Sequence, residues 1–411
     1  MLRLLIAVLF VSLVTVSGSA ENWPSWRGPD FNGVAPKGNF PTAWSDTGNV
    51  AWKVDLPGNG SSTPVVWEDH IILTATADAS NVVLCLDRNG KEKWRVTSGV
   101  ARSGKHKKAT GSNPSPVTDG KHIYVYFKSG DLSCLTFDGK LVWELNLQEE
   151  YGEDTLWWDL GTSPVLTRKH VVVAVMQTGP SYLIALDKTT GKPAWKQDRN
   201  LGAPLEAAQS YSTPIVTTRE GKESIIVLGA DYVTAHDAAN GQQQWKIGTL
   251  NPQGEKYWRS IASPVISEGI ILAPYARGKT LTAIDLSGST PKIAWAVDNI
   301  CADVPTPIAM KDKAITMTDR GLVTQIEIKT GKVIWQTEVE KNRLAFSASP
   351  ILAGGHVYLT REDGATFVID AKTGSTVAKN MLTEALAVST PVFADGKILI
   401  RTSNNLYCIG K

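Results

Sequence analysis

Cysteine is scarce in this chain, and its spacing excludes two common kinds of site. The 411 residues include only four cysteines, and no two of them are adjacent. They are Cys85, Cys134, Cys301 and Cys408. Scattered single cysteines make neither a disulfide framework nor a zinc site with paired ligands, so no metal site is predicted. All except Cys301 stand where other copies of a repeat carry alanine, which favours small buried core residues.

An excess of charge of one sign is also missing. Lysine and arginine total 42, aspartate and glutamate total 40, and the formal net charge is +2. A chain so close to balance has no general electrostatic preference for nucleic acid or for an anionic membrane. We therefore expect neither as a partner.

Long apolar runs are limited to one segment near the N-terminus. Residues 4–16 are predominantly apolar, follow Arg3, and lead to the small residues Gly18-Ser19-Ala20. A membrane anchor needs roughly 20 apolar residues, so we predict a signal peptide over residues 1–20 with cleavage after Ala20. Glu21 stands where a lipoprotein would carry cysteine. These features predict a periplasmic or secreted protein without a lipid anchor.

The sequence also lacks the short motifs of several large enzyme classes. It contains no Gly-x-Ser-x-Gly, no phosphate-binding loop and no His-Glu-x-x-His. Acyl transfer, nucleotide hydrolysis and zinc proteolysis therefore have no support, and no residue is predicted to be catalytic. A glycosidase needs only two carboxylates at a suitable separation, so that class stays open.

What the sequence does contain is an internal repeat. A small hydroxyl residue, a proline and then valine or isoleucine recur eight times, roughly 40 to 52 residues apart, which is the span of one propeller blade. The eight prolines are Pro64, Pro116, Pro164, Pro214, Pro264, Pro307, Pro350 and Pro391. Each copy continues through alternating strands and an Asp-to-Gly turn into a strand that commonly carries tryptophan. The repeat predicts an all-β, eight-bladed propeller of four-stranded antiparallel blades over residues 50–411.

Half of the fourteen tryptophans occupy one position of this repeat. They are Trp52, Trp94, Trp143, Trp195, Trp245, Trp295 and Trp335. A large flat side chain at one fixed place in each blade is suited to fill the gap to the next blade. We predict a structural role in blade docking. Ala378 breaks the series, so the contact between the seventh and the closing blade is expected to be looser.

The two ends of the repeat region complete each other. The last copy ends at Lys411 without a tryptophan strand, whereas residues 50–54 form such a strand with no copy before it. Pairing the N-terminal strand with the C-terminal blade would close the ring and remove its open edges. Residues 21–49 are then a leader that we expect to pack on the propeller.

The pattern Ala-x-Asp-x-x-x-Gly-x-x-x-Trp, found at residues 185–195 and 235–245, resembles the pyrroloquinoline-quinone (PQQ) repeat family. The resemblance spans nearly all of residues 21–411. The family includes quinoprotein dehydrogenases and non-catalytic envelope propellers of the BamB type. The opening Trp23 to Pro29 is also similar to the leader of secreted PQQ-repeat proteins of planctomycete-type bacteria.

The dehydrogenase branch of the family implies PQQ, Ca²⁺, an aspartate base and a disulfide between adjacent cysteines. This chain has no adjacent cysteines, and its loops are short. We therefore expect no cofactor, with PQQ and Ca²⁺ as the alternative.

Several segments that precede the prolines lead toward the channel and form a candidate ligand-binding mouth. Trp157, Trp158 and Asp159 combine flat rings with a carboxylate, although a blade-connecting loop is the favoured interpretation. Comparable positions before later prolines hold Gln209, Tyr211, Trp258, Arg259, Asp303 and Phe346. As a hypothesis, Arg259 faces Asp159 or Asp303. The one dense basic run, residues 102–108, is interpreted as a solvated loop.

The favoured function is a non-catalytic, exported propeller that acts as a protein-interaction scaffold in the cell envelope. Its partners would be envelope or secreted proteins, and we expect a monomer. Two alternatives remain open, a PQQ- and calcium-dependent dehydrogenase and a carbohydrate or peptide binder that uses the channel mouth.

Overall fold

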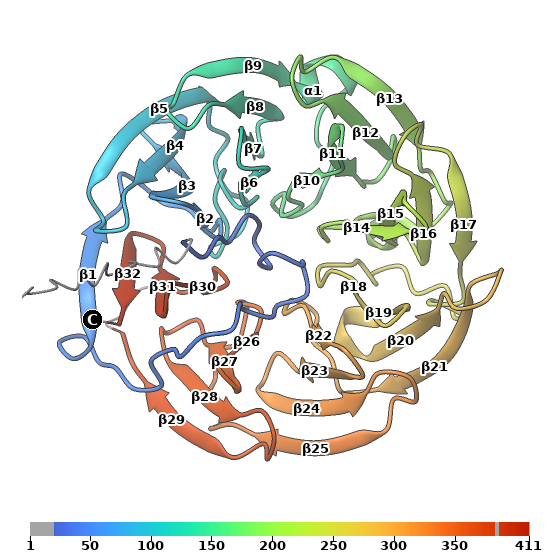
Figure 1. Cartoon of the computed structure of the whole chain (residues 1–411). Helices are drawn as coiled ribbons and strands as arrows, with labels where there is room; N and C mark the ends of the chain where they lie inside the picture. The colour runs from blue at the N-terminus through green and yellow to red at the C-terminus, as the bar shows by residue number, and fades with distance from the viewer. Residues whose placement is uncertain (1–19, 383–385, 411) are drawn as a thin grey trace, which may run out of the picture.

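The computed structural model of the protein describes residues 20–382 and 386–410. Eight four-stranded antiparallel sheets stand around a common axis and form a ring (Figure 1). The predicted all-β, eight-bladed propeller is confirmed. Apart from Ala20, the predicted signal peptide lies outside the described residues. None of the helices in the described ranges is long and apolar enough to cross a membrane.

The first four blades follow one another along the chain. Blade 1 contains β2 (Val65–Trp67), β3 (His70–Ala77), β4 (Ser80–Leu86) and β5 (Glu92–Val100). Blade 2 contains β6 (Val117–Thr118), β7 (Ile123–Tyr126), β8 (Asp131–Leu135) and β9 (Leu141–Asn146), and is followed by helix α1 (Leu147–Tyr151). Blade 3 contains β10 (Val165–Leu166), β11 (His170–Val175), β12 (Tyr182–Asp187) and β13 (Pro193–Asp198). After the short 3₁₀ helix η1 (Leu205–Ala208), blade 4 contains β14 (Ile215–Arg219), β15 (Lys222–Gly229), β16 (Tyr232–Asp237) and β17 (Gln243–Ile247).

The second half of the ring has the same plan. Blade 5 contains β18 (Val265–Ser267), β19 (Ile270–Tyr275), the 3₁₀ turn η2 (Ala276–Gly278), β20 (Thr280–Asp285) and β21 (Lys292–Asp298). Blade 6 contains β22 (Ile308–Met310), β23 (Lys313–Met317), β24 (Leu322–Glu327) and β25 (Val333–Glu338). Blade 7 contains β26 (Ile351–Ala353), β27 (His356–Thr360), β28 (Thr366–Asp370) and β29 (Thr376–Asn380). Blade 8 contains β30 (Val392–Ala394), β31 (Lys397–Arg401), β32 (Asn405–Ile409) and β1 (Val50–Asp55).

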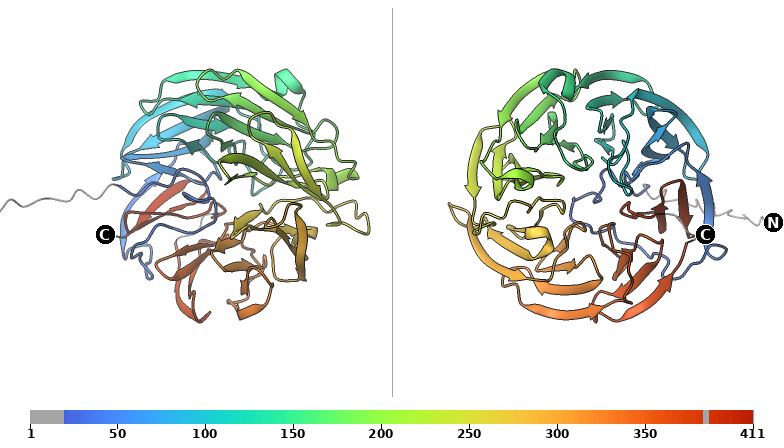
Figure 2. Two further views of the ribbon diagram at one scale, coloured as in Figure 1. Left: turned by 45° about the vertical axis from the view of Figure 1, so that its right-hand side comes forward. Right: turned by 180° about the vertical axis from the view of Figure 1, so that it is seen from behind.

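Blade 8 closes the ring with strands from both ends of the chain. Strand β1 pairs antiparallel with β32, and Trp52 lies opposite Cys408. The two strands lie side by side in Figure 1 and again in the view from behind in Figure 2. The predicted closure by the N-terminal strand is therefore confirmed.

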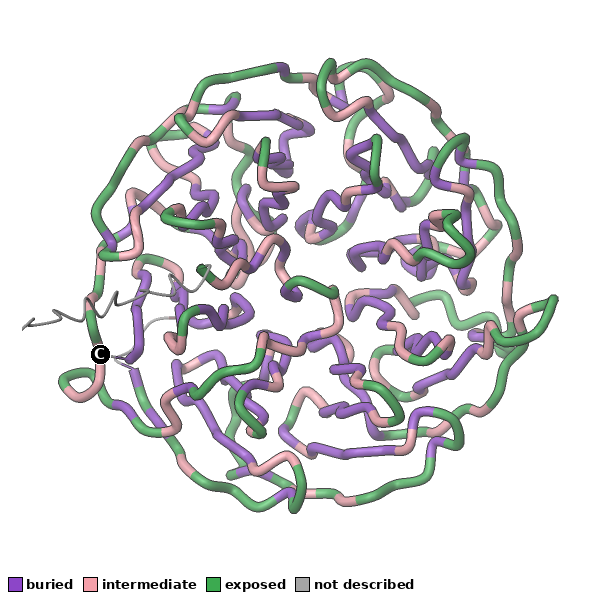
Figure 3. The backbone as a smooth tube through the Cα atoms, viewed as in Figure 1, coloured by how far each residue is buried: buried purple, intermediate pink, exposed green. Residues whose placement is uncertain are grey.

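Burial falls from the inside of each blade to the outside. The second and third strands are buried along most of their length, whereas the outer strand alternates between exposed and half-buried residues (Figure 3). A strand covered on both faces must be apolar throughout, and an outer strand covered on one face alternates. The blade cores merge into clusters that each span neighbouring blades.

The repeated tryptophans lie on these outer strands and contact the next blade. Six of their indole N–H groups donate to a backbone carbonyl of that blade at 2.8 to 3.2 Å. In blade 3, the turn glycine Gly191 has φ +69°, and a Cβ atom there would lie 2.5 Å from the Trp143 ring. The Asp-to-Gly turn thus supplies both left-handed backbone and room for the indole. Trp245 differs and packs in an apolar cluster shared by blades 4 and 5.

The leader crosses one end of the central channel (Figure 1). Trp23 bridges Val66 of blade 1, and Val34 bridges Leu352 of blade 7. Between them, the Arg27 guanidinium donates to the carbonyls of Pro307 and Pro350 at 2.6 and 2.8 Å. Burial lowers the pKa of this guanidinium to about 9. The leader therefore connects blade 1 with blades 6 and 7.

The leader also fills the junction where the repeated tryptophan is missing. Trp44 is buried and stacks on Tyr358 of blade 7 at 6.4 Å between ring centroids. Phe40 meets Phe393 of blade 8 edge to face at 5.2 Å. Ala378 packs against the same cluster. The looser contact expected at Ala378 is thus offset by leader aromatics, which the repeat pattern could not indicate.

Candidate functional site

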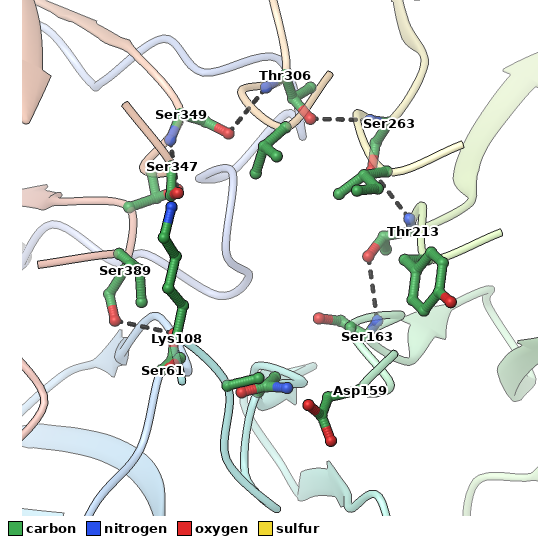
Figure 4. Close-up of a pocket in the computed structure, with 18 of the residues that line it drawn as sticks. Ser61, Lys108, Asp159, Ser163, Thr213, Ser263, Thr306, Ser347, Ser349 and Ser389 are labelled. Atoms are coloured by element: carbon green, nitrogen blue, oxygen red, sulfur yellow. Dashed lines mark hydrogen bonds between the residues drawn. The ribbon is translucent and has the colours of Figure 1, made fainter. Parts of the chain in front are cut away.

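A closed collar of hydroxyl groups surrounds the channel. Its members are the residues that directly precede the eight prolines, Thr63, Ser115, Ser163, Thr213, Ser263, Thr306, Ser349 and Thr390. Each hydroxyl oxygen accepts a hydrogen bond from the backbone N–H of the corresponding residue in the preceding blade, at 2.8 to 3.3 Å. Part of this circle is visible in Figure 4. The repeat motif contained these residues, but their mutual bonding was not predicted.

The collar lines a cavity of about 510 Å³. On one side of the collar runs the leader, which contacts residues two positions after their prolines, such as Val66 and Leu352, and places Trp26 in the cavity wall. On the other side lie the loops that precede the prolines, and these form the mouth. Pockets of this size hold small organic ligands.

Asp159 lies at the mouth as a fully engaged carboxylate. It is buried, and it accepts hydrogen bonds from the backbone N–H groups of Lys105 and His106 at 2.8 to 2.9 Å. The buried Lys128 ammonium forms an ion pair with the same carboxylate. The basic run at residues 102–108 is therefore attached to the mouth at this point, although most of its residues are exposed to solvent. Asp159 positions that loop.

Arg259, in the loop before blade 5, is the central cation of the adjoining wall. Its Nη2 donates to Asp303 Oδ2 at 2.8 Å, and its Nε lies 3.4 Å from Glu206. The predicted pairing with Asp303 is present, whereas Asp159 pairs with Lys128. Burial raises the pKa of the Asp303 carboxyl above its usual value, although the nearby Arg259 opposes the shift. Arg259 Nε and Nη1 are buried without a hydrogen-bond partner.

A second cation, Lys108, spans the mouth toward blade 7 (Figure 4). Its Nζ donates to Glu362 Oε1 at 2.5 Å, and Ser347 Oγ donates to the same oxygen at 2.6 Å. The Glu362 side chain is only 3% exposed. The carboxylate is thus held by two donors.

Exposed aromatic and apolar side chains lie on the rim over blades 3 to 5. Trp157, Trp158, Leu205 and Tyr257 are 45%, 43%, 45% and 51% exposed. The rings of Trp157 and Tyr257 are 6.4 Å apart. Trp158 Nε1 donates to Glu206 at 2.7 Å, next to Leu205. We call these four residues the rim patch.

The remaining predicted mouth residues lie in different surroundings. Tyr211 lines the cavity, and its hydroxyl donates to the buried Gln209, which also accepts from the backbone N–H of Trp157. Trp258 packs against the core of blades 4 and 5, and Phe346 is buried between blades 6 and 7. Of the nine predicted residues, Trp158, Asp159, Tyr211 and Arg259 line the cavity.

Most of the residues that line the cavity were not among the predicted site residues, and three of them have large aromatic or cationic side chains. Trp26 belongs to the leader, Lys108 to the basic run, and Arg277 to the turn η2. Lys108 could have been proposed from the sequence, because it lies in a dense basic run that precedes a proline motif. Nothing in the repeat pattern singles out Arg277.

The residues present do not fit a calcium-dependent quinone site. Ca²⁺ is held by several oxygen ligands, chiefly carboxylates. Over residues 20–382 and 386–410, no group of three or more His, Cys, Asp or Glu side chains could hold a metal ion. Asp159 and Glu362 each bind a lysine ammonium instead.

Comparison with known proteins identifies relatives over most of the chain. A family model described as outer membrane protein assembly factor BamB matches residues 35–103, 79–337 and 252–411. BamB of Escherichia coli is 24% identical over 87% of each chain. BamB of Yersinia pestis is 36% identical over 24% of this chain, a match that spans 27% of the Yersinia protein.

Solved structures share the fold at low identity. BamB from Moraxella catarrhalis superposes with a TM-score of 0.65 at 13% identity, over 88% of this chain and 99% of that chain. A europium-containing methanol dehydrogenase superposes with a TM-score of 0.71 at 11% identity, over 95% and 98%. Scaffold and enzyme share one architecture, so the fold does not choose between them.

Proposed function

The chain belongs to the family of the outer membrane protein assembly factor BamB, and we propose that it is an exported, non-catalytic scaffold in the assembly of outer membrane proteins. The signal-like segment at residues 4–16 supports export to the periplasm or beyond. The proposed partners are envelope proteins, bound by a monomeric propeller.

The observation that carries this proposal is the rim patch. Tryptophan and tyrosine are enriched at the energetic centres of protein interfaces, because they bury a large area and retain a polar group. Soluble proteins rarely leave several such side chains together in solvent without a partner. The basic loop at residues 102–108 borders the patch, since His106 meets Trp158 edge to face at 5.7 Å. The surface therefore suits an apolar segment flanked by acidic residues.

The test removes the patch and leaves the ring intact. A Trp157→Ala/Tyr257→Ala variant should lose affinity for the outer membrane assembly machinery by roughly thirtyfold, the loss expected when one interface centre is truncated. In cells that lack the wild-type gene, it should also lower the amount of folded outer membrane proteins. Association is measured by co-purification with the machinery, and folding by heat-modifiable mobility of the β-barrels.

The matched control is Ile293→Ala/Val333→Ala, which truncates two exposed apolar residues on the outer strands β21 and β25. This variant should behave like the wild type. Normal outer membrane protein assembly in cells without the gene would overturn the proposal.

The alternative of a PQQ- and calcium-dependent dehydrogenase rests on the fold alone. It predicts tight, calcium-dependent binding, measured as heat when PQQ is titrated into the purified chain. We expect none, because Asp159, the carboxylate in the cavity lining, is already paired with Lys128.

A further inference from the structure

We propose that the central cavity is a binding site for an acidic saccharide of one or two sugar rings. This function is separate from partner docking at the rim patch, of which only Trp158 also lines the cavity. The leader runs across one end of the cavity and contributes Trp26 to its wall. It suits a small ligand that enters through the mouth.

The collar offers hydrogen bonds that the protein does not use. Each of the eight hydroxyl oxygens accepts one backbone N–H, which leaves its own O–H to donate. Within the described ranges, none of these O–H groups donates to a protein acceptor, and all eight residues line the cavity. A ligand rich in oxygen atoms would satisfy them.

The cation on the wall is incompletely paired. Only 11% of the Arg259 side chain is exposed, and the bond from Nη2 to Asp303 fixes its guanidinium. Its Nη1 is buried without any partner, and its Nε lies 3.4 Å from the Glu206 carboxylate without a hydrogen bond to it. Buried donors without acceptors are costly. A carboxylate in the cavity would provide an acceptor for Nη1, and a guanidinium is well suited to bind it.

A second guanidinium reaches the cavity from a hairpin turn of blade 5. Ala276 and Arg277 both have left-handed backbone, with φ of 55° and 56°. The equivalent hairpins of blades 1 and 4 have the same pair of left-handed residues, which is typical of tight hairpin turns. Arg277 lines the cavity, and its Nε lies 3.9 Å from Asp303 Oδ2. Asp303 thus keeps the guanidinium groups of Arg259 and Arg277 close together in the cavity wall.

Aromatic side chains complete the site. Trp158 at the mouth is held by its bond to Glu206, and Trp26 lies in the wall near the leader. The electron-rich face of an indole attracts the C–H groups on the apolar face of a sugar ring. Two such surfaces, a hydroxyl collar and two guanidinium groups are together the contacts that an acidic sugar needs.

The wall chemistry favours a saccharide over the carboxyl terminus of a peptide. Hydroxyl side chains dominate the lining, with serines such as Ser61, Ser347 and Ser389 in addition to the collar. A hydroxyl both donates and accepts, as sugar hydroxyls do.

The test is isothermal titration of digalacturonate into the full chain without its signal segment, with lactose as a neutral disaccharide. We expect binding of digalacturonate, at least tenfold weaker binding of lactose, and weakening of the acidic ligand by added salt. Arg259→Gln should weaken digalacturonate binding by roughly tenfold or more, because a charged hydrogen bond is lost. Arg277→Gln, at a half-exposed side chain, should weaken it less.

Arg95→Gln is the matched control, because Arg95 pairs with Glu92 on β5, away from the cavity. It should bind like the wild type. If Arg259→Gln unfolds, Arg277→Gln still decides the role of the cations. The proposal is overturned if digalacturonate produces no heat, if lactose binds as well, if both arginine variants bind like the wild type, or if only a tripeptide with a free carboxyl terminus binds.

Discussion

The collar and the mouth of the channel show two different uses of the same chain. The collar consists of eight equivalent residues with one bonding pattern, so the repeat alone builds it. At the mouth, every loop is different, and Asp159, Arg259 and Lys108 each have their own partner. The periodic part provides a uniform frame, and the unique loops provide charge and selectivity.

The blade junctions show the same contrast. Most junctions are closed by an indole from the repeat, which donates to the next blade. The junction between blades 7 and 8 has Ala378 at that position and is filled by Phe40 and Trp44 of the leader. A segment outside the repeat therefore supplies what the repeat lacks at the point where the ring closes.

The largest expected effect on stability comes from removing a leader aromatic from the junction between blades 7 and 8. Trp44→Ala should lower the free energy of unfolding by about 3–5 kcal/mol, because it empties a buried aromatic site. Trp94→Ala removes a half-buried repeat tryptophan and should cost less. Urea denaturation of both variants measures the difference. An equal or smaller loss for Trp44→Ala would show that the leader is dispensable for closure.

The next effect is a pH dependence in one blade of the periodic part. His236 is buried in β16, and burial lowers its pKa from 6.5 to about 4, with the nearby Arg199 acting in the same direction. Between these pH values the unfolded chain binds a proton and the folded chain does not. Stability that is present above pH 6.5 is therefore lost as the pH falls toward 4, by roughly 3 kcal/mol.

His236→Gln should remove most of this loss, as measured by urea denaturation at pH 7 and pH 4. His356→Gln, at the start of β27 in blade 7, is the control and should keep the wild-type pH dependence. If the two variants have the same pH dependence, His236 is not the group responsible.

The repeated blades were predictable from the sequence. For the mouth loops, the sequence indicated which kinds of residue are present but not where their side chains lie. Proline spacing and alternating strands determine eight blades, since each copy must bury the same faces. The distance of a residue from its proline does not determine where its side chain points, because loop lengths differ. Trp158 precedes Pro164 by six residues and lines the cavity, whereas Phe346 precedes Pro350 by four and is buried in the core. The pairing of Asp159 with Lys128 depends on the three-dimensional fold of both segments.

The smallest expected effect tests whether the collar is uniform. Thr213→Val and Thr306→Val each remove one acceptor and leave the N–H of Ser163 or Ser263 without its partner. Each should cost about 1 kcal/mol, because water in the cavity can replace part of the lost bond. Equivalent positions in a periodic ring should respond equally, and urea denaturation measures both. If one variant costs several times more than the other, the ring is not uniform, and the neighbouring mouth loops contribute to its stability.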